Sequence, residues 1–332
     1  MTIKPIVLVS GTLEHAPDLF EELSLEFEFK FHTEVNREEF IQNLKNSQYD
    51  GLYAILFIDF DIIERFDKEL FSLLPPSLQL IAIGAAGYDN VDLQEASRRG
   101  IWVTNVPGGA CDSTAEIALH LILSACRGTY YAEKLLRKGL WREGIRMGMD
   151  VKGKKLGILG MGKIGKAVAS RALGFGVELY YHNRHPLSTA EETLYQAKYL
   201  ALDEFLATID ILSINAPLNE ANYHLINENS LKKMKDDIVI VNTGRGKIID
   251  EQALVNGLKS GKIFAAGLDV FENEPSIHPY LTTCDRVTIL PHIGWQTPGT
   301  FQGFEVAVLR VLQHTFSFGK PENPLNCIQS NT

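Results

Sequence analysis

The sequence predicts an α/β fold with two doubly wound parallel-sheet domains, one inserted into the other. Short apolar runs alternate with amphipathic segments along the chain, and this pattern is typical of parallel strands joined by helical crossovers. The length of 332 residues is sufficient for two such domains. A glycine-rich turn, Gly160-x-Gly162-x-x-Gly165, directly follows one apolar run, as expected where a parallel strand passes into a helix.

Composition and charge narrow the classes of function. With 45% hydrophobic and 22% charged residues, the chain can bury a large core. The net charge of −9 argues against nucleic acid as the main partner. The longest apolar stretch, residues 117–125, is too short to span a bilayer, and no signal peptide is recognisable, so we expect a cytoplasmic protein without membrane contact. The four cysteines show neither metal-ligand nor disulfide spacing, and we expect free thiols and no metal site.

Residues 1–102 form the first part of one predicted domain. We expect strands at 6–9, 25–31, 51–56 and 80–83 and a helix at 37–45. The last strand runs into Gly84-Ala85-Ala86-Gly87, at the strand end where doubly wound sheets bind ligands. A strand and a cluster of turn residues at 102–109 mark the first hinge.

The second predicted domain covers residues 103–296. We expect its strands at 156–159, 178–181, 211–214, 238–241, 265–268 and 287–290, with helices at 201–207, 229–234 and 251–260. A helix at 300–318 is long enough to return to the first domain. Residues 297–332 therefore complete that domain, and the second domain is inserted with hinges near residues 103 and 296.

A further helix is expected at 117–126. Ser113 and Glu116 have the spacing of a capping box at its start. The helix is apolar nearly all round, and such a helix needs cover on every side. We expect the region 113–126 to form a homodimer interface; burial in the chain's own core is the alternative.

The glycine-rich turn predicts a dinucleotide-binding Rossmann domain. Gly160 allows the tight turn, Gly162 lets backbone N–H groups approach a pyrophosphate, and Gly165 lets the helix pack close to the strand. The N-terminus of that helix contributes unpaired N–H groups and partial positive charge. A turn without a ligand is the alternative, and the flanking strand and helix make it the weaker one.

The end of the second strand of this domain indicates which cofactor is bound. Dinucleotide sites usually have an acidic residue here that binds the ribose hydroxyls of NAD, whereas this chain has Asn183, followed by Arg184 and His185. The missing carboxylate removes repulsion of a 2′-phosphate, and a guanidinium can pair with that phosphate. We therefore favour NADP(H); if Arg184 only stacks on adenine, NAD(H) also binds.

Three residues at later strand ends supply one chemistry together. These are Arg245, Glu274 and His292, and each one alone has a purely structural explanation. A carboxylate beside an imidazole raises the pKa of the histidine, which can then act as acid or base. An arginine binds a substrate carboxylate and polarises a neighbouring carbonyl.

With these motifs the chain resembles the D-isomer-specific 2-hydroxyacid dehydrogenases over nearly its whole length, and it is most similar to their glyoxylate/hydroxypyruvate reductase branch. The resemblance rests on the glycine turn and on the motifs Asn242-Thr243-Gly244-Arg245-Gly246, Asp269-Val270-Phe271-x-x-Glu274-Pro275 and Pro291-His292-Ile293-Gly294. The motifs at 84–92 and 105–108 add to it. It implies a flavodoxin-like substrate domain beside the Rossmann domain, and hydride transfer between the nicotinamide and C2 of a 2-keto acid.

The resemblance also implies roles for individual residues. His292 would be the proton donor, Glu274 its partner, and Arg245 the anchor of the substrate carboxylate and carbonyl. Backbone amides of Ala85, Ala86 and Gly87 would hold the other side of the carboxylate. Further positions match cofactor contacts: Lys163, Ile164, Ala216, Pro217, Thr243, Gly244, Asp269 and Gly294.

The chain departs from the family's pattern at two positions. Asn183 replaces the usual acidic residue, as in NADP-preferring members. Asn222 stands where many members have threonine near the pyrophosphate, which leaves that contact open. Trp141 resembles a tryptophan that reaches into the partner subunit's active site in the reductase branch; anchoring its own loop is the alternative.

The small residues at 84–87 leave room for a short substrate, and we expect glyoxylate, hydroxypyruvate or a similar 2-keto acid. Tyr53 is the candidate that faces them. A bulkier keto acid is the first alternative. A non-catalytic, cofactor-sensing protein like the corepressors that share this fold is the second.

Overall fold

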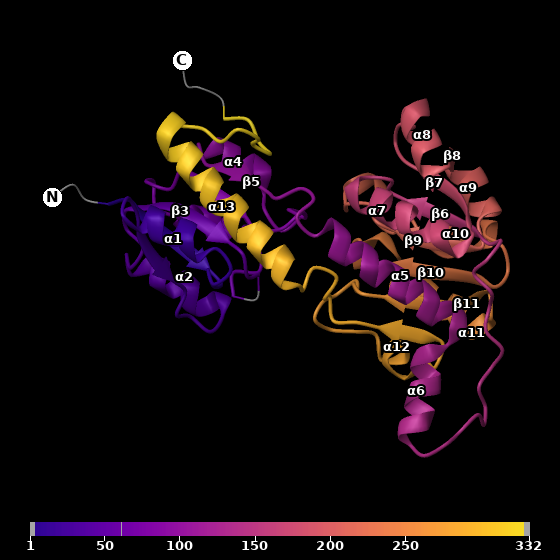
Figure 1. The fold of residues 1–332 in the computed structure, drawn as a ribbon. Helices are drawn as coiled ribbons and strands as arrows, with labels where there is room; N and C mark the ends of the chain where they lie inside the picture. Colours follow the sequence, from indigo (N-terminus) through magenta and orange to yellow (C-terminus); the bar gives the residue numbers. More distant parts are fainter. Residues whose placement is uncertain (1–3, 61, 329–332) are drawn as a thin grey trace. The chain divides into compact units, whose positions relative to one another are not determined.

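The computed structural model describes residues 4–60 and 62–328. The chain divides into two compact units (Figure 1): unit 1 comprises the described residues within Met1–Gly109 and Thr297–Thr332, and unit 2 comprises Ala110–Gln296. Unit 2 is therefore inserted into unit 1. Residues 1–3 and 329–332, which the predicted substrate domain includes, lie outside the described residues.

Unit 1 contains a five-stranded parallel sheet in the order β2-β1-β3-β4-β5. This order is the flavodoxin-like one. The strands are β1 (Ile6–Ser10), β2 (Glu28–Phe31), β3 (Leu52–Phe57), β4 (Leu80–Ile83) and β5 (Trp102–Thr104). The central strands β3 and β4 are almost entirely buried because helices cover both faces of the sheet.

The helices of unit 1 form two layers. Helices α2 (Arg37–Lys45), α3 (Lys68–Leu73) and α4 (Leu93–Arg98) cover one face, and α1 (Pro17–Ser24) and α13 (Pro298–Phe318) cover the other. Strand β2 is shorter than the predicted 25–31 because the first turn after α1 takes up residues 25–27. The predicted hinge at 103 is too early, since β5 pairs with β4 and thereby belongs to unit 1.

Unit 2 contains a seven-stranded parallel sheet in the order β12-β11-β10-β9-β6-β7-β8. The strands are β6 (Lys155–Leu159), β7 (Glu178–His182), β8 (Ala197–Tyr199), β9 (Ile211–Ile214), β10 (Ile238–Asn242), β11 (Ile263–Leu268) and β12 (Val287–Ile289). The order reverses between β6 and β9, as in a Rossmann fold. The short edge strand β8 escaped prediction because it has only three residues, of which one is buried.

Helices cover both faces of this sheet as well. One layer contains α5 (Cys111–Arg127) and α7 (Lys163–Ala172); the other contains α9 (Leu202–Thr208), α10 (Glu228–Lys233), α11 (Glu251–Ser260) and α12 (Pro279–Thr283). Helices α6 (Thr129–Arg137) and α8 (Thr189–Tyr195) and the 3-10 turns η1 (Leu173–Phe175), η2 (Glu220–Asn222) and η3 (Gly246–Ile248) complete the unit. The two hydrophobic clusters thus lie on either side of the sheet.

The start of α5 differs from the prediction. The helix begins at Cys111 with Ala110 as N-cap and no side-chain cap, so the predicted capping box at Ser113 does not form. The Ser113 hydroxyl instead donates to the carbonyl of Ala110 at 3.2 Å, because both residues are within the first turn. The buried face of α5, which includes Ala118, Leu121 and Ile122, packs on its own sheet. Much of its apolar character is therefore explained without a second subunit.

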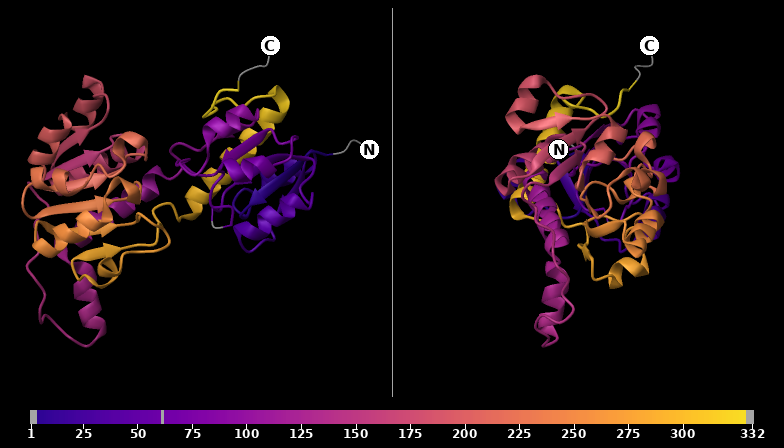
Figure 2. Two further views of the ribbon diagram at one scale, coloured as in Figure 1. Left: turned by 180° about the vertical axis from the view of Figure 1, so that it is seen from behind. Right: turned by 90° about the vertical axis from the view of Figure 1, so that its right-hand side faces the viewer.

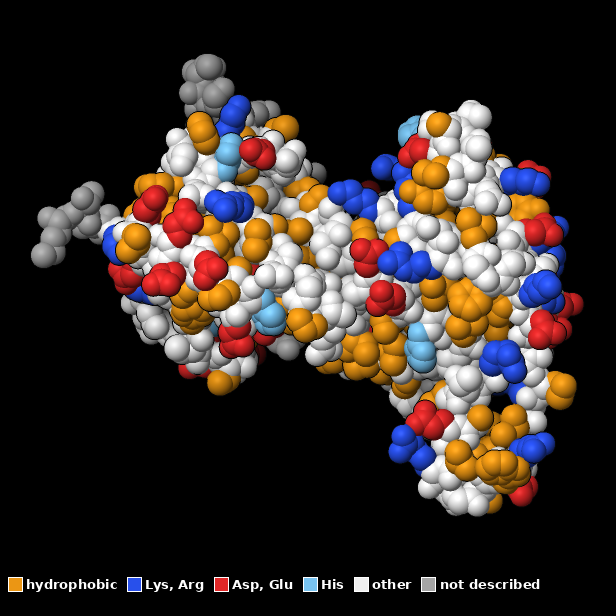
Figure 3. Space-filling view, in the orientation of Figure 1, with side chains coloured by type: hydrophobic (Ala, Val, Ile, Leu, Met, Phe, Trp, Pro, Cys, Tyr) orange, Lys and Arg blue, Asp and Glu red, His pale blue; other side chains and the backbone are white. Residues whose placement is uncertain are grey.

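Helix α6 and the loop that follows it, residues 129–150, project beyond the rest of unit 2 (Figure 2). We call this segment the arm. Its apolar side chains Leu136, Leu140, Trp141 and Met147 are exposed, and Figure 3 shows hydrophobic side chains gathered at this end of the unit.

Within residues 4–60 and 62–328, no helix is long and apolar enough to cross a membrane. The four cysteines are unpaired. The cytoplasmic location expected from the sequence stays a prediction.

Candidate active site

The site of unit 2 is built from loops at the carboxyl ends of its parallel strands. Because all seven strands run in the same direction, these loops meet at one edge of the sheet. Ligands of doubly wound sheets bind at this edge, where the strand order reverses. In unit 2 the reversal lies between β6 and β9, and β6 carries the glycine turn.

The three glycines of this turn have different surroundings. Gly160 has φ +95°, and a Cβ there would lie 2.5 Å from the Ala216 nitrogen. A Cβ on Gly165 would lie 2.3 Å from the Gly160 carbonyl oxygen, whereas one on Gly162 would meet no atom within 4 Å. Gly162 is also the N-cap of the ten-residue helix α7, without a side-chain cap. The turn therefore presents an open backbone at a helix N-terminus, which fits the pyrophosphate of a dinucleotide.

Asn183 directly follows β7 and contacts the glycine turn. Its side-chain oxygen accepts a hydrogen bond of 2.7 Å from the Met161 N–H. Arg184 and His185 are exposed beyond it. The asparagine oxygen is thus used within the protein, and no acidic side chain stands at this strand end.

The loop after β9 carries Ala216, Pro217 and Asn222. The Asn222 amide donates to the Pro217 carbonyl at 2.7 Å, and its oxygen accepts from the Asn219 N–H at 2.7 Å. Asn222 therefore closes this loop on itself. Its contact with a cofactor stays a prediction.

Asn242 shapes the loop that carries Arg245, a role that the sequence prediction missed. Its amide donates to the Arg245 carbonyl at 2.9 Å, and its oxygen accepts from the Gly244 N–H at 3.0 Å. Thr243 is fixed by a 3.1 Å hydrogen bond from its hydroxyl to the Asn215 side chain. In the sequence, Asn242 is a polar residue at the last position of an otherwise apolar strand. This position was the signal that could have indicated its role.

Glu274 and His292, which are 18 residues apart, form a pair. His292 Nδ1 lies 2.8 Å from Glu274 Oε2, and both side chains are more than a third exposed. Burial raises the pKa of Glu274, but the hydrogen bond and charge of His292, the Phe271 N–H and the charge of Arg245 outweigh it, and the pKa lies below its usual range. His292 can therefore present Nε2 as the reactive nitrogen while Glu274 holds Nδ1.

Asp269 fixes the backbone next to His292. Its buried carboxylate accepts hydrogen bonds from the N–H groups of Ile293 and Gly294, at 2.9 and 2.8 Å. Burial raises the pKa of this carboxyl group. A Cβ on Gly294 would lie 2.8 Å from Asp269 Oδ2. Asp269 and Gly294 thus contact each other and hold His292, whose φ is +55°.

In unit 1, the loop after β4 contains Ala85, Ala86 and Gly87. The Val106 N–H donates to the Ala85 carbonyl at 2.9 Å, and the Asn105 amide donates to the Ala86 carbonyl at 2.7 Å. Among the residues that the structure describes, none accepts a hydrogen bond from the N–H groups of 85–87. This turn therefore has three backbone donors available for an anion.

Tyr53 does not face this turn, contrary to the prediction. It lies near the amino end of β3, whereas residues 84–87 follow the carboxyl end of the parallel strand β4. Its ring packs against Phe27 and Phe316 under the helix layer of α1 and α13. The carboxyl end of β3 brings Ile58 there instead, where a Cβ on Gly84 would lie 3.2 Å from it.

Comparisons with known proteins agree with this arrangement. Residues 119–294 match the family described as D-isomer specific 2-hydroxyacid dehydrogenase, NAD binding domain. The chain is 42% identical over 318 residues to 4-methyl-2-oxopentanoate reductase A of Aspergillus oryzae, covering 95% of this chain and 96% of that protein.

Two solved structures are also similar. A glyoxylate reductase from Paecilomyes thermophila has a TM-score of 0.91 and 41% identity and covers 97% of this chain and 98% of its own. An NADPH-dependent glyoxylate/hydroxypyruvate reductase from Sinorhizobium meliloti, in complex with NADP and malonate, has a TM-score of 0.84 and 31% identity, with 97% of both chains covered.

Proposed function

The chain belongs to the D-isomer-specific 2-hydroxyacid dehydrogenases and reduces 2-keto acids with a nicotinamide cofactor, and we propose that His292, Glu274 and Arg245 carry out this reaction. The observation that supports the assignment is the accessible 2.8 Å pair between His292 and Glu274 at the ligand edge of unit 2. Arg245 follows the neighbouring strand β10, and its charge acts on Glu274.

The reaction needs a hydride at C2 of the keto acid and a proton at its carbonyl oxygen. A nicotinamide cofactor held at the glycine turn would supply the hydride. Protonated His292 gives its Nε2 proton to the carbonyl oxygen, and the Glu274 carboxylate stabilises the imidazolium beforehand. Arg245 binds the substrate carboxylate and polarises the carbonyl. A contact of the N–H groups of Ala85, Ala86 and Gly87 with the substrate carboxylate stays a prediction from the sequence.

We further propose a preference for NADP(H) over NAD(H). Asn183 keeps the end of β7 free of negative charge, and exposed Arg184 and His185 follow it. In Asn183→Asp the new carboxylate repels a 2′-phosphate, so the ratio of kcat/KM for NADPH to that for NADH should fall by about tenfold or more. Arg184→Ala should lower the same ratio. An unchanged ratio in both variants would favour dual cofactor use.

For the substrate we propose a short 2-keto acid, glyoxylate or hydroxypyruvate, with a bulkier keto acid as the second candidate. The small residues of the 84–87 turn favour the first. The 42% identity to a 4-methyl-2-oxopentanoate reductase favours the second.

The decisive experiment measures initial rates of NADPH and NADH oxidation with glyoxylate, hydroxypyruvate, pyruvate, phenylpyruvate and 4-methyl-2-oxopentanoate. Highest kcat/KM with the two-carbon and three-carbon acids supports the short-substrate proposal. Highest kcat/KM with 4-methyl-2-oxopentanoate or phenylpyruvate retains the mechanism and changes the substrate. Tight cofactor binding without any turnover would favour a sensing protein.

We also propose a homodimer, formed through the arm rather than through α5 alone. Trp141 is 65% and Met147 is 89% exposed, and such apolar exposure is typical of interfaces. Only a few α5 side chains, such as Glu116 and His120, remain exposed to extend the contact. Sedimentation of Trp141→Asp should give a monomer where the parent chain gives a dimer. If Trp141→Asp is still a dimer and dissociates no more readily than the parent chain, the interface lies elsewhere.

A further inference from the structure

The loop that carries Glu274 contains a second histidine–glutamate pair. His224 Nε2 lies 2.8 Å from Glu272 Oε1, with the two side chains 29% and 18% exposed. Glu272 precedes Glu274 by two residues, and His224 follows the loop after β9 that carries Asn222. This pair therefore joins the loop after β9, where the pyrophosphate contact is predicted, to the loop that carries Glu274. The proposed reaction does not use either residue of the pair.

Glu272 is also tied to the start of α11. Its second carboxylate oxygen accepts a hydrogen bond from the Glu251 N–H at 3.1 Å, and its own N–H donates to Glu251 Oε2 at 3.2 Å. The other Glu251 oxygen accepts from the His278 N–H at 3.2 Å. The Glu272 side chain thus has one oxygen on His224 and one on the first residue of a ten-residue helix.

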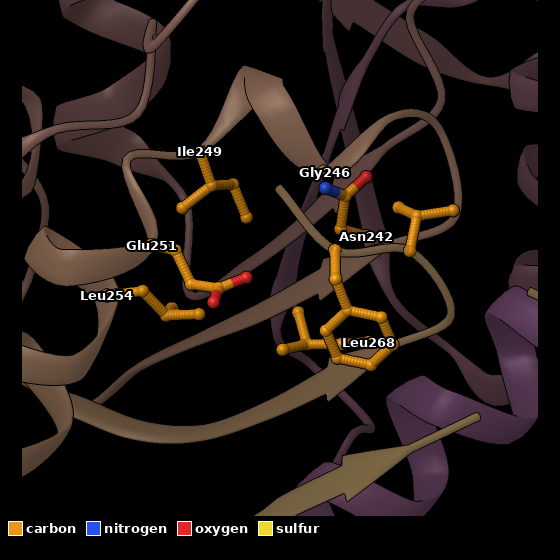
Figure 4. Close-up of a pocket in the computed structure, with 8 residues that line it drawn as sticks. Asn242, Gly246, Ile249, Glu251, Leu254 and Leu268 are labelled. Atoms are coloured by element: carbon orange, nitrogen blue, oxygen red, sulfur yellow. The ribbon is translucent and has the colours of Figure 1, made fainter. Parts of the chain in front are cut away.

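Phe271 contacts the surroundings of the proposed catalytic side chains through both of its peptides, the one before it with its N–H and the one after it with its carbonyl group. The Phe271 N–H donates to Glu274 Oε1 at 2.8 Å. Gly246, the neighbour of Arg245, lies so close that a Cβ there would be 1.9 Å from the Phe271 carbonyl carbon and oxygen. Phe271 also lines a small space, and Figure 4 shows Gly246 and the Glu251 carboxylate among the other residues around it. Its volume of about 10 Å³ leaves room for one water at most, so the peptide cannot shift without losing packing.

His224 is itself held firmly. Its backbone N–H donates to the Lys247 carbonyl at 2.9 Å, two residues beyond Arg245. Its φ of +49° is unfavourable for a residue other than glycine, and the ring stacks on Tyr223 with centroids 4.0 Å apart. Such a backbone persists only where its surroundings impose it.

We propose that His224 and Glu272 are positioning residues: their pairing fixes the Phe271–Glu272 peptide and with it the Phe271 backbone, whose own N–H orients Glu274 against His292. The inference rests on the catalytic role proposed for Glu274 and His292. The charged groups around Glu274 are His292, Arg245 and Asp269; His224 acts on Glu274 through the backbone.

The test is a double-mutant cycle between His224 and Glu274, read as the pH profile of kcat/KM for reduction. His224→Ala should lower kcat/KM for the keto acid by about tenfold to a hundredfold and move the half-maximal pH downwards, in the direction of Glu274→Gln. Because His224 acts through Glu274, the double variant should move the profile no further than Glu274→Gln alone. His224→Gln keeps a donor at the position of Nε2 and should restore most of the rate.

Lys262→Met is the matched control. It removes an ion pair with Asp236 and a hydrogen bond to the Met234 carbonyl in the same unit, at the amino ends of β10 and β11 and thus away from the carboxyl ends that carry the site. It should lower the melting temperature and leave the pH profile unchanged.

The outcomes separate this inference from the proposed mechanism. If the Glu274→Gln profile moves while that of His224→Ala stays in place, or if the two shifts add in the double variant, the positioning role is wrong and the mechanism stands. If the Glu274→Gln profile does not move, the Glu274 assignment and the positioning role are both wrong.

Discussion

Units 1 and 2 both pair histidines with glutamates, and two buried glutamates of unit 1 contrast with the more exposed Glu274 of unit 2. In unit 1 the carboxylates of Glu34 and Glu305 are fully buried, with 0% side-chain exposure. In unit 2, His292 and Glu274 are 37% and 36% exposed. The distances are alike, at 2.6 and 3.0 Å in unit 1 and 2.8 Å in unit 2. Distance therefore does not distinguish these buried pairs from the pair proposed to be reactive, whereas the exposure of the carboxylate does.

The buried carboxylates of unit 1 are fully occupied. Glu34 accepts hydrogen bonds from Tyr49 and Asn43 besides its contact with His32. Glu305 on α13 accepts from three consecutive backbone N–H groups, at Glu14, His15 and Ala16, directly before α1. These groups have no lone pair left for a substrate. Their function is to join distant segments of the chain.

The glutamate of the unit 2 pair has fewer hydrogen bonds. Among the residues that the structure describes, Glu274 accepts from His292 Nδ1 and the Phe271 N–H, and His292 Nε2 has no partner. The four predictions below test whether accessibility separates chemistry from stability, beginning with the largest expected effect.

His292→Asn should abolish most of the turnover without affecting the fold. Loss of a general acid lowers kcat by about 10²–10⁴-fold, whereas a partly exposed side chain contributes little to stability. Steady-state rates of keto-acid reduction and the melting temperature together test this. A variant that retains the parent rate would remove His292 from the reaction.

Glu34→Gln should lower stability and leave kcat unchanged. Although burial raises the pKa of Glu34, hydrogen bonds from Tyr49, Asn43 and His32 lower it to about 2, from an ordinary 4.5. The ionised Glu34 carboxylate is therefore more favourable in the folded chain than in the unfolded chain. Its contribution to the free energy of unfolding is complete above pH 4.5 and is lost as the pH falls towards 2. The free energy of unfolding in urea should be lower by about 1–3 kcal/mol at pH 7.

The difference between Glu34→Gln and the parent chain should narrow when the same urea titration is made at pH 3. A constant difference at both values would mean that the carboxylate charge is not the stabilising feature.

Glu274→Gln should change the pH dependence more than the maximal rate. Because His292 contributes to the low pKa of Glu274, the carboxylate in turn favours protonated imidazole, the form required for reduction. Without that charge, the pH at which reduction is half-maximal should fall. The measurement is kcat/KM for the keto acid between pH 5 and 9; an unmoved profile would contradict the pairing.

His15→Gln should have the smallest effect. The ring contacts Glu305 at 3.0 Å and stacks on Phe301, but it is 32% exposed, and the three backbone N–H groups still satisfy Glu305. We expect a loss of about 0.5–1.5 kcal/mol in the free energy of unfolding. A loss of activity instead would show that access alone does not mark the reactive pair.

Patterns local in the chain were predictable. Hydrophobic periodicity and turn chemistry predict the strand, turn and helix around Gly160 and Gly165, the strand-end positions of Arg245 and His292, and the return helix at 300–318. Helix α13 (Pro298–Phe318) is observed at the place of this return helix. The capping box at Ser113 failed because the same local pattern allows two helix starts, and contacts of α5 with the sheet select the earlier one.

Two parallel sheets, the glycine turn and the residue types at the strand ends could be derived from the amino-acid order, because they depend on the succession of apolar, polar and glycine residues. Which strand end each side chain reaches, and how much solvent surrounds it, became known from the folded chain. Tyr53 lies at the amino end of its strand, and Glu272, three residues after Asp269, is paired with His224. Parallel register and burial join residues far apart in the chain, and no local pattern specifies those pairings.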